Sequence, residues 1–195
     1  MLASITPLGE RGRHGHWTIT VLAFGLGGTA AGALAGGLLG AAGGLLLGAT
    51  PEDPRLVVLA CALLGAIALD LRPGAAPGPR RQVNERWLTQ YRGWVYGLGY
   101  GTQLGVGIST VVTSAATYVA LLAAFLTAGA GPGALIMGGY GAIRGLTPLL
   151  AARVHTGAQL LTLHARLAGA RRTTTRAGLA LLGVALILAL AGSLA

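Results

Sequence analysis

The chain has 195 residues, of which 53% are hydrophobic and only 10% are charged, and its mean hydropathy is +0.68. This balance excludes a disordered chain, and the single cysteine excludes a disulfide-stapled secreted domain. No charged side chain occurs over residues 17–51, 93–143 and 177–195. Since a helix needs about 20 apolar residues to cross a bilayer, these runs predict an integral membrane protein.

Five membrane-spanning helices are expected, near residues 17–48, 55–71, 93–127, 133–153 and 177–195. Helix-breaking residues separate them: Pro51 and Pro54 follow the first span, a Pro- and Gly-rich run over 73–79 follows the second, and a Gly-rich run over 129–133 follows the third. The predicted fold class is all-α, a polytopic membrane helical bundle. It forms a single membrane domain over residues 1–195, with residues 1–16 as a cytoplasmic N-terminal segment.

Positive charge is unevenly distributed among the connecting segments. All 14 cationic side chains are arginines, and the segments on one side of the predicted bundle hold most of them: Arg11, Arg13, Arg72, Arg80, Arg81, Arg86, Arg92, Arg153, Arg166, Arg171, Arg172 and Arg176. The opposite side holds only Arg55, beside Glu52 and Asp53. Because cytoplasmic loops are enriched in basic residues, this pattern predicts a multi-pass protein of the cytoplasmic (inner) membrane, with its N-terminus in the cytoplasm and its C-terminus outside.

The segment before the first span leaves one alternative open. Arg11 and Arg13 precede an apolar run that begins at Trp17, as in a signal peptide. The run continues without a pause to Gly48, which favours an uncleaved span.

Small residues recur at every fourth position in the first and third expected spans. The glycines concerned are Gly28, Gly32, Gly36, Gly40 and Gly44 in the first, and Gly97, Gly101 and Gly105 in the third. Glycine costs about 1 kcal/mol relative to alanine inside a helix, and close approach of two helix backbones compensates for that cost. We interpret both series as helix-packing ridges of the glycine-zipper type, at the centre of the protein or at an oligomer contact. The alternative is that a Gly-, Ala- and Leu-rich composition produces such spacing by chance.

The two long spans also begin alike, with Phe24-Gly25-Leu26-Gly27 in one and Tyr96-Gly97-Leu98-Gly99 in the other. This similarity leaves an internal duplication open. Both spans exceed the length needed to cross, which predicts strong tilt, a kink near Gly27-Gly28 and 99–101, or a broken helix.

Arg144 lies well inside the fourth expected span, where an unpaired charge is costly. At 1.5 Å per residue, Asp70 of the second span reaches a similar depth. We therefore expect Arg144 and Asp70 to form an intramembrane charge pair, or Arg144 to contact an anionic ligand. A third possibility is that Asp70 lies at the cytoplasmic interface beside Arg72.

Hydroxyl and amide side chains follow the third expected span, and several of them share one helix face. The candidates for a polar path are Gln103, Thr110, Thr113, Ser114 and Thr117. The alternative is that these side chains bond only to their own backbone or to a neighbouring helix.

The segment 153–176 mixes leucines with arginines and histidines and is typical of an amphipathic helix on the inner membrane surface. The bilayer, and anionic headgroups in particular, are the partners expected at the arginine-rich cytoplasmic loops. Although the net charge is +9, the arginines lie beside apolar spans, so we expect no nucleic acid partner.

Catalytic and metal-binding patterns are missing from the sequence. It contains no Cys-x-x-Cys, no His-Glu-x-x-His, no P-loop and no Gly-x-Ser-x-Gly, and five carboxylates in all. The histidines have no acidic residue or cysteine nearby that would complete a metal site. We therefore expect no enzyme, no metal and no cofactor.

Glycine-rich helices open each half of the chain, over 24–29 and 97–103. In outline, over residues 17–155, this arrangement resembles the small transmembrane thiol-disulfide carriers of cytochrome c biogenesis and related small exporters. Each half of that family carries a Pro-Cys, where this chain has Gly28-Thr29 and Thr102-Gln103, and its members have six spans rather than five. The resemblance therefore implies a relative that has lost its cysteine pair.

These observations predict a small transporter-like protein that moves a small or anionic solute. The alternative is a non-catalytic membrane subunit or scaffold that packs against a membrane-protein partner or a second copy. A transporter predicts polar side chains on more than one helix, whereas a subunit predicts an uncovered small-residue surface at membrane depth.

Overall fold

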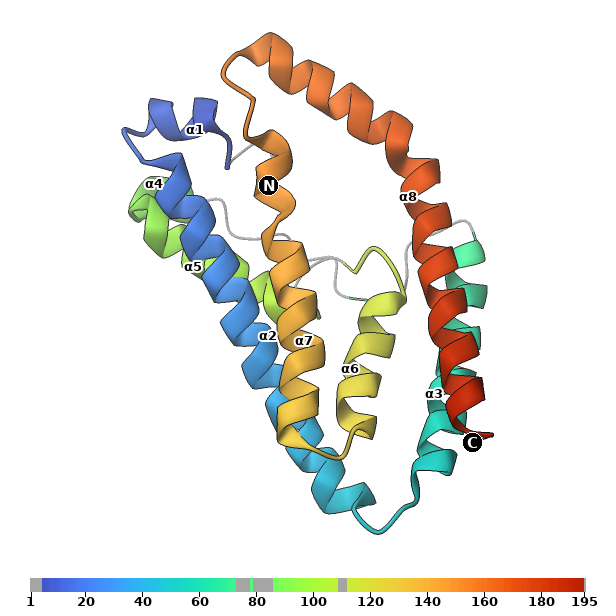
Figure 1. The fold of residues 1–195 in the computed structure, drawn as a ribbon. Coiled ribbons are helices and arrows are strands. Elements are labelled where there is room, and N and C mark those ends of the chain that lie inside the picture. The colour runs from blue at the N-terminus through green and yellow to red at the C-terminus, as the bar shows by residue number, and fades with distance from the viewer. Residues whose placement is uncertain (1–4, 73–77, 79–85, 109–111, 195) are drawn as a thin grey trace.

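The computed structural model describes residues 5–72, 78, 86–108 and 112–194, and every regular element among them is a helix (Figure 1). The elements are α1 (Pro7–Gly12), α2 (Trp17–Leu47), α3 (Glu52–Leu71), α4 (Trp87–Gln90), α5 (Gly93–Val106), α6 (Ala116–Leu126), α7 (Ala130–Gly145), the short 3-10 helix η1 (Thr147–Ala151) and α8 (Gly157–Gly192). The predicted all-helical class is confirmed for this part of the chain.

Among the described residues, four helical segments are long and apolar enough to cross a bilayer: Trp17–Leu47, Glu52–Leu71, Ala130–Ala151 and Gly157–Gly192. The first two nearly coincide with the spans expected near 17–48 and 55–71. The third combines α7 with η1 and matches the expected span 133–153. The fourth is much longer than the expected 177–195, because α8 begins at Gly157.

The expected third span over 93–127 is wrong as a single helix. The chain there forms α5 and α6, which have 14 and 11 residues and are each too short to cross a bilayer alone. α5 ends where Gly107 takes a φ of +89°, a left-handed conformation that glycine adopts without a steric penalty. The break thus lies beyond 99–101, where α5 is still helical, and α2 continues as a helix through Gly27 and Gly28.

α2 is the central helix, and α5 and α7 pack along it, whereas α3 packs with α8. The short helix α6 contacts α2, α3 and α7 and so links the two groups (Figure 1). Two clusters of buried apolar residues accompany this division. One cluster includes Phe24, Tyr96 and Tyr100, and the other includes Leu63 and Leu182.

The glycines of α2 lie where other backbones come closest. A Cβ atom on Gly32 would overlap the carbonyl oxygen of Met137 in α7, and one on Gly36 would overlap that of Gly133 in the same helix. A Cβ on Gly40 would overlap the carbonyl oxygen of Gly129, the residue before α7. At Gly28 a Cβ would lie 3.0 Å from the carbonyl oxygen of Gly141, and at Gly44 it would lie 2.9 Å from that of Ala128. This face of α2 therefore has no room for side chains.

The glycines of α5 face α2 in the same way. A Cβ on Gly97, Gly101 or Gly105 would meet the carbonyl oxygen of Thr20, Phe24 or Gly28, respectively. Gly28 thus lies between α5 and α7, and its own carbonyl would be overlapped by a Cβ on Gly141 as well. Both glycine series are covered by helices of the same chain.

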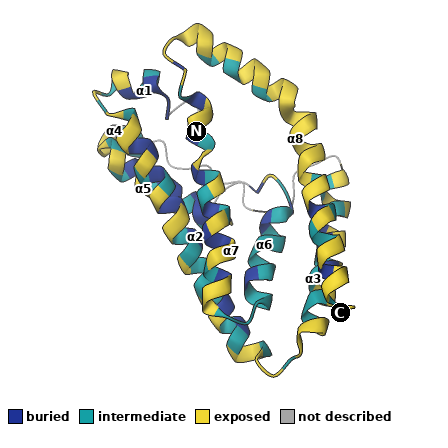
Figure 2. Ribbon diagram, viewed as in Figure 1, coloured by how far each residue is buried: buried dark blue, intermediate teal, exposed yellow. Residues whose placement is uncertain are grey.

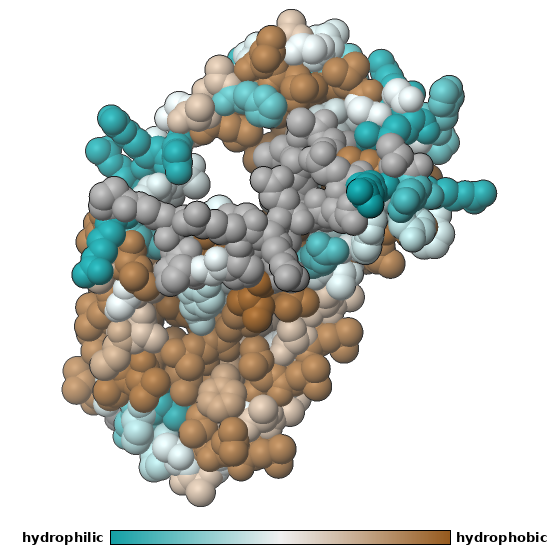
Figure 3. Space-filling model, turned by 180° about the vertical axis from the view of Figure 1, so that it is seen from behind, coloured by the Kyte–Doolittle hydropathy of each residue, from teal (hydrophilic) through white to brown (hydrophobic). Residues whose placement is uncertain are grey.

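Apolar side chains cover the outside of the helices. Leu38, Leu45 and Leu135 are each more than 70% exposed, and exposed residues line the outer faces in Figure 2. In Figure 3 hydrophobic residues cover the lower part of the molecule, and most hydrophilic side chains gather toward its upper end. Such an exterior suits the acyl chains of a bilayer and would be unfavourable in water.

The predicted amphipathic segment 153–176 is largely the first half of α8, continuous with the expected last span. Thr156 starts the helix through a capping box with Gln159, in which each side chain accepts a hydrogen bond from the backbone of the other. This half leans over the upper end of the molecule, and the second half runs beside α3 (Figure 1).

Candidate functional site

Polar side chains converge around the break between α5 and α6. Residues 112–114 are not helical, and α6 starts two residues after Ser114. A broken helix exposes backbone groups that need partners, because no water is present in the hydrocarbon core to satisfy them. Two neighbouring helices, α3 and α7, supply side chains to this region, as the following contacts show.

Asp70, near the end of α3, holds the start of α6. Its Oδ2 accepts a hydrogen bond from the hydroxyl of Ser114 at 2.6 Å, and its Oδ1 accepts one from the backbone N–H of Ala115 at 2.9 Å. The Ser114 Oγ also accepts from the N–H of Ala116 at 3.1 Å. A carboxylate at this position satisfies free N–H groups and complements the positive end of the helix dipole.

Arg55, near the start of α3, holds the other end of α6. Its Nη1 donates to the carbonyl oxygen of Leu126, the last residue of α6, at 3.2 Å. α3 and α6 run antiparallel, so the acid of α3 meets the positive end of α6 and the base meets the negative end. A helix of 11 residues is marginal by itself, and these contacts help to keep it formed.

Arg144, in the last turn of α7, belongs to a second polar chain. Its Nη1 donates to the hydroxyl oxygen of Tyr140 at 2.6 Å, and its guanidinium carbon lies 5.4 Å from the centre of the Tyr140 ring. The hydroxyls of Tyr140 and Thr117 are 2.8 Å apart. Since Tyr140 accepts from Arg144, its own proton is available to Thr117, which is 6% exposed.

The structure does not bring Asp70 and Arg144 together as an ion pair. Asp70 accepts from residues at the start of α6, and Arg144 donates to Tyr140 on its own helix. Similar depth along two helices was the reason for expecting the pair. Depth does not define the direction in which a side chain points around its helix axis, and these two side chains point to different neighbours.

The residues predicted to form a polar path have different environments. Thr117 is buried, Ser114 and Gln103 are half-buried, and Thr113 is exposed. Thr110 lies outside the described residues. Ser114 and Thr117 therefore belong to the polar region at the break, in contact with Asp70 and Tyr140 respectively. Gln103 lies on α5, before the break.

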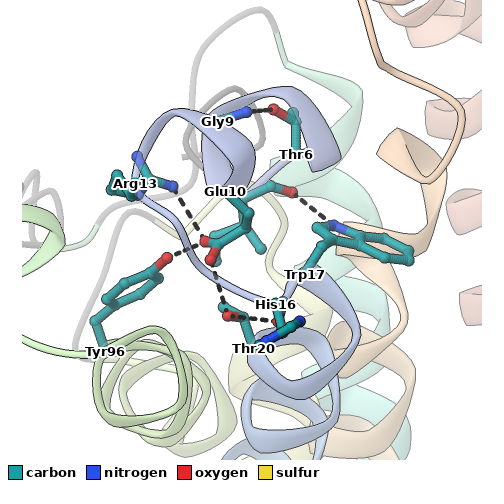
Figure 4. A network of polar contacts seen from close by, with 9 residues as sticks. Thr6, Gly9, Glu10, Arg13, His16, Trp17, Thr20 and Tyr96 are labelled. Carbon is teal, nitrogen blue, oxygen red and sulfur yellow. Dashed lines mark hydrogen bonds and ion pairs between the residues drawn. The ribbon is translucent and has the colours of Figure 1, made fainter.

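A further polar network, which sequence reasoning missed, surrounds Glu10 (Figure 4). Glu10 is only 1% exposed and accepts hydrogen bonds from Arg13 at 3.1 Å, from Thr20 at 3.2 Å and from the hydroxyl of Tyr96. The Arg13 guanidinium also lies over the Tyr96 ring. These contacts tie α1 to both α2 and α5.

The local sequence explains how α1 positions Glu10. Thr6 caps the helix by accepting from the N–H of Gly9 at 2.9 Å, and Pro7 occupies the first helical position. Gly15 allows the return of the chain toward α2, since a Cβ there would overlap the Glu10 carboxylate. This Thr-Pro helix start and the lone acid directly before Arg11 and Arg13 are the available signals in a segment predicted to be cytoplasmic.

A cavity of about 570 Å³ adjoins this network, between the starts of α2 and α5. Glu10, Arg13, His14, His16 and Arg92 line it together with apolar and aromatic side chains. Among the described residues no group of three or more His, Cys, Asp or Glu could hold a metal ion.

Comparisons with known proteins find no matching family model, no similar curated protein and no similar solved structure. The chain has one cysteine, Cys61, which is exposed on α3. A single chain therefore cannot form an internal disulfide, as a thiol-disulfide carrier would require. The functional proposal rests on the geometry of the polar groups.

Proposed function

We propose that this protein is a transporter-like, multi-pass protein of the cytoplasmic membrane that moves a small or anionic solute. One observation carries the proposal: polar side chains of α3 and of α7 reach the start of α6, beside a helix break, in two separate hydrogen-bonded networks within an otherwise apolar bundle. Discontinuous helices whose free backbone ends and polar side chains come together are typical of substrate sites in transporters. Irregular backbone at such a depth is tolerated where protein or a water-filled cavity surrounds it.

The proposed topology has five crossings, with α5 and α6 together forming the third. Successive segments α2, α3, α5 with α6, α7 and α8 alternate in direction in Figure 1, which supports this count. The N-terminus would then lie in the cytoplasm and the C-terminus outside. The arginines on the first half of α8 would face anionic headgroups at the inner surface.

Arg144 is the proposed contact for an anionic solute. Its guanidinium contacts the neutral hydroxyl and the ring of Tyr140, and no carboxylate among the described residues lies within salt-bridge distance of it. Guanidinium groups favour carboxylate and phosphate ligands because their parallel N–H groups match two oxygens. Thr117 and Tyr140 would complete the polar contacts of the solute.

The alternative role as a subunit requires an uncovered small-residue surface. The α2 and α5 glycines do not provide one, because α5 and α7 cover them within the chain. These two glycine series therefore supply no surface for a partner.

Water access to the break tests the proposal. In a Cys61→Ala background, Thr117→Cys should react with a membrane-impermeant thiol reagent, because a transport path is hydrated. The matched control is Leu38→Cys, which is exposed on the apolar exterior of α2 and should stay unlabelled in the bilayer. Equal protection of both cysteines would refute a polar path.

Charge movement provides the direct measurement. Proteoliposomes on a solid-supported membrane should give a transient current on a jump in the concentration of acetate, chloride or inorganic phosphate. Arg144→Gln should abolish that current, whereas Arg171→Gln, which removes the same charge from the surface of α8, should preserve it. An unchanged current in Arg144→Gln would remove Arg144 from the transport path.

A further inference from the structure

The cavity beside Glu10 is separate from the helix break, and its lining residues are different. It lies where α2 and α5 begin, at the arginine-bearing end of the molecule, and has a volume of about 570 Å³. This volume is within the range of small-molecule sites. Its lining combines the cationic Arg13 and Arg92, two imidazoles and exposed apolar surface such as that of Ile19 and Trp94.

The electrostatics of the cavity favour an anion. Glu10 compensates the charge of Arg13, with which it forms the only ion pair among the described residues. Arg92 therefore has no acidic partner in this part of the chain, and its side chain is exposed. Among the described residues, the positive charge of Arg92 at this cavity is therefore uncompensated.

The starts of two helices add to this positive potential. His16 is the N-cap of α2 and Arg92 is the N-cap of α5, and neither helix has a side-chain capping hydrogen bond. A basic residue at a helix N-terminus faces the positive end of the dipole and is unfavourable. An anion bound between the two helix starts would reverse this effect and would also contact the imidazoles of His14 and His16, which line the same cavity.

The surroundings place the cavity at the level of lipid headgroups. The three tryptophans of the chain are Trp17, Trp87 and Trp94, and they lie at the starts of α2, α4 and α5. Tryptophans concentrate at the interface between bilayer and water. Ile19 and Trp94 are each 51% exposed, so the cavity has an apolar side on which an acyl chain can lie.

We propose that this cavity binds a phosphate group, carried by an anionic phospholipid or present as free phosphate, with Arg92 as its main contact and His14 and His16 as hydrogen-bond donors. Glu10 holds Arg13 and the start of α2 in place (Figure 4) and does not contact the ligand. The site is independent of transport through the helix break.

Calorimetric titration of the full-length protein in detergent tests the site. The probes are short-chain phosphatidylglycerol, short-chain diacylglycerol, which has the same tails without the phosphate, and inorganic phosphate. Phosphatidylglycerol should bind saturably with one molecule per chain, and diacylglycerol should not. Arg92→Gln should weaken the binding of phosphatidylglycerol about 10-fold or more, because a charge-assisted contact is lost.

Two variants control for charge and folding. Arg171→Gln removes an equal charge from an exposed position on α8 and should change the affinity less than about 2-fold, and Arg92→Lys should retain more of the affinity than Arg92→Gln. Inorganic phosphate that competes with the lipid in an Arg92-dependent manner would identify the free ion as a second source, and lack of competition would identify the lipid alone. Equal binding of both lipids, or equal losses in Arg92→Gln and Arg171→Gln, would overturn the proposal.

Discussion

The carboxylate of Asp70 lies at the start of a helix to which it does not belong. It accepts from the Ser114 hydroxyl and the Ala115 N–H, so it replaces the capping residue that α6 lacks. A charged acceptor contributes about 1.5–3 kcal/mol per hydrogen bond when buried and less when partly exposed. Asp70 is therefore a structural contact of the helix break.

A double-mutant cycle on unfolding free energy in detergent separates the partners of Asp70. We expect a coupling of about 1–2 kcal/mol between Asp70→Ala and Ser114→Ala, because each removes the same hydrogen bond. Asp70→Ala and Arg144→Gln should be additive within about 0.5 kcal/mol. A strong coupling with Arg144 would restore the charge pair that the sequence suggested.

Glu10 gives a second prediction at the level of single residues. Glu10→Ala should destabilise the protein by about 2–4 kcal/mol, since it removes the carboxylate that accepts from the buried hydroxyls of Thr20 and Tyr96 and from the Arg13 guanidinium. Arg13 is 28% exposed, and solvent lowers its share of this cost.

Denaturant unfolding in detergent measures this effect. Arg11→Gln is the matched control on the same helix, where the side chain is exposed, and should lie within about 0.5 kcal/mol of the original protein. A similarly small effect of Glu10→Ala would mean that α1 is not tied to the bundle through this carboxylate.

At the level of helices, contact between backbones determines the packing of α2, α5 and α7. A side chain on Gly36 would overlap the Gly133 carbonyl and the Met137 side chain. A backbone carbonyl cannot turn away as a flexible side chain can. Helices in a bilayer associate through such close packing because lipid offers no hydrophobic driving force between them.

Gly36→Leu should therefore lower the free energy of unfolding in detergent by at least about 3 kcal/mol, which is the upper range for overpacking a tight core. Gly139→Leu on α7 is the matched substitution, because a Cβ there meets nothing within 4 Å, and it should be neutral within about 1 kcal/mol. Leu38→Ala, on the opposite exterior, should also be mild. Equal losses in Gly36→Leu and Gly139→Leu would contradict close packing at Gly36.

For the whole molecule, the open question of topology is whether α5 and α6 together cross the membrane. Four long helices alone would place both termini on one side, whereas a crossing by the broken pair places them on opposite sides. The arginine distribution predicts the second arrangement with the N-terminus inside.

Reporter fusions decide between these topologies. A reporter that is active only outside the cytoplasm should be active when fused after Ala195 and silent when fused at Gly78. A silent fusion at Ala195 would indicate four crossings. An active fusion at Gly78 would contradict the orientation.

The sequence by itself determined the all-helical class of this protein and the approximate bounds of three long helical segments, Trp17–Leu47, Glu52–Leu71 and Ala130–Ala151. Long uncharged runs predict membrane helices because burial in lipid depends on composition over many residues, and Pro- and Gly-rich turns mark where such helices stop. The regular glycine spacing is also visible along the chain, and in the structure a Cβ on Gly32, Gly36 or Gly101 would overlap a backbone carbonyl of another helix. These are local or periodic properties, which are visible along the chain.

Only the tertiary structure decided which polar groups meet. Asp70 and Arg55 reach the two ends of α6, and Glu10 reaches Tyr96 on α5, across 86 positions of the chain. Which polar side chains contact each other depends on how each helix is rotated about its axis and on which helices are neighbours. No local sequence pattern contains that information. The break at Gly107 also depends on tertiary contacts. Glycines occur throughout this helix, so a glycine alone does not mark its end. The new helix beyond the break is stabilised by Asp70 of α3, which accepts from the Ala115 N–H.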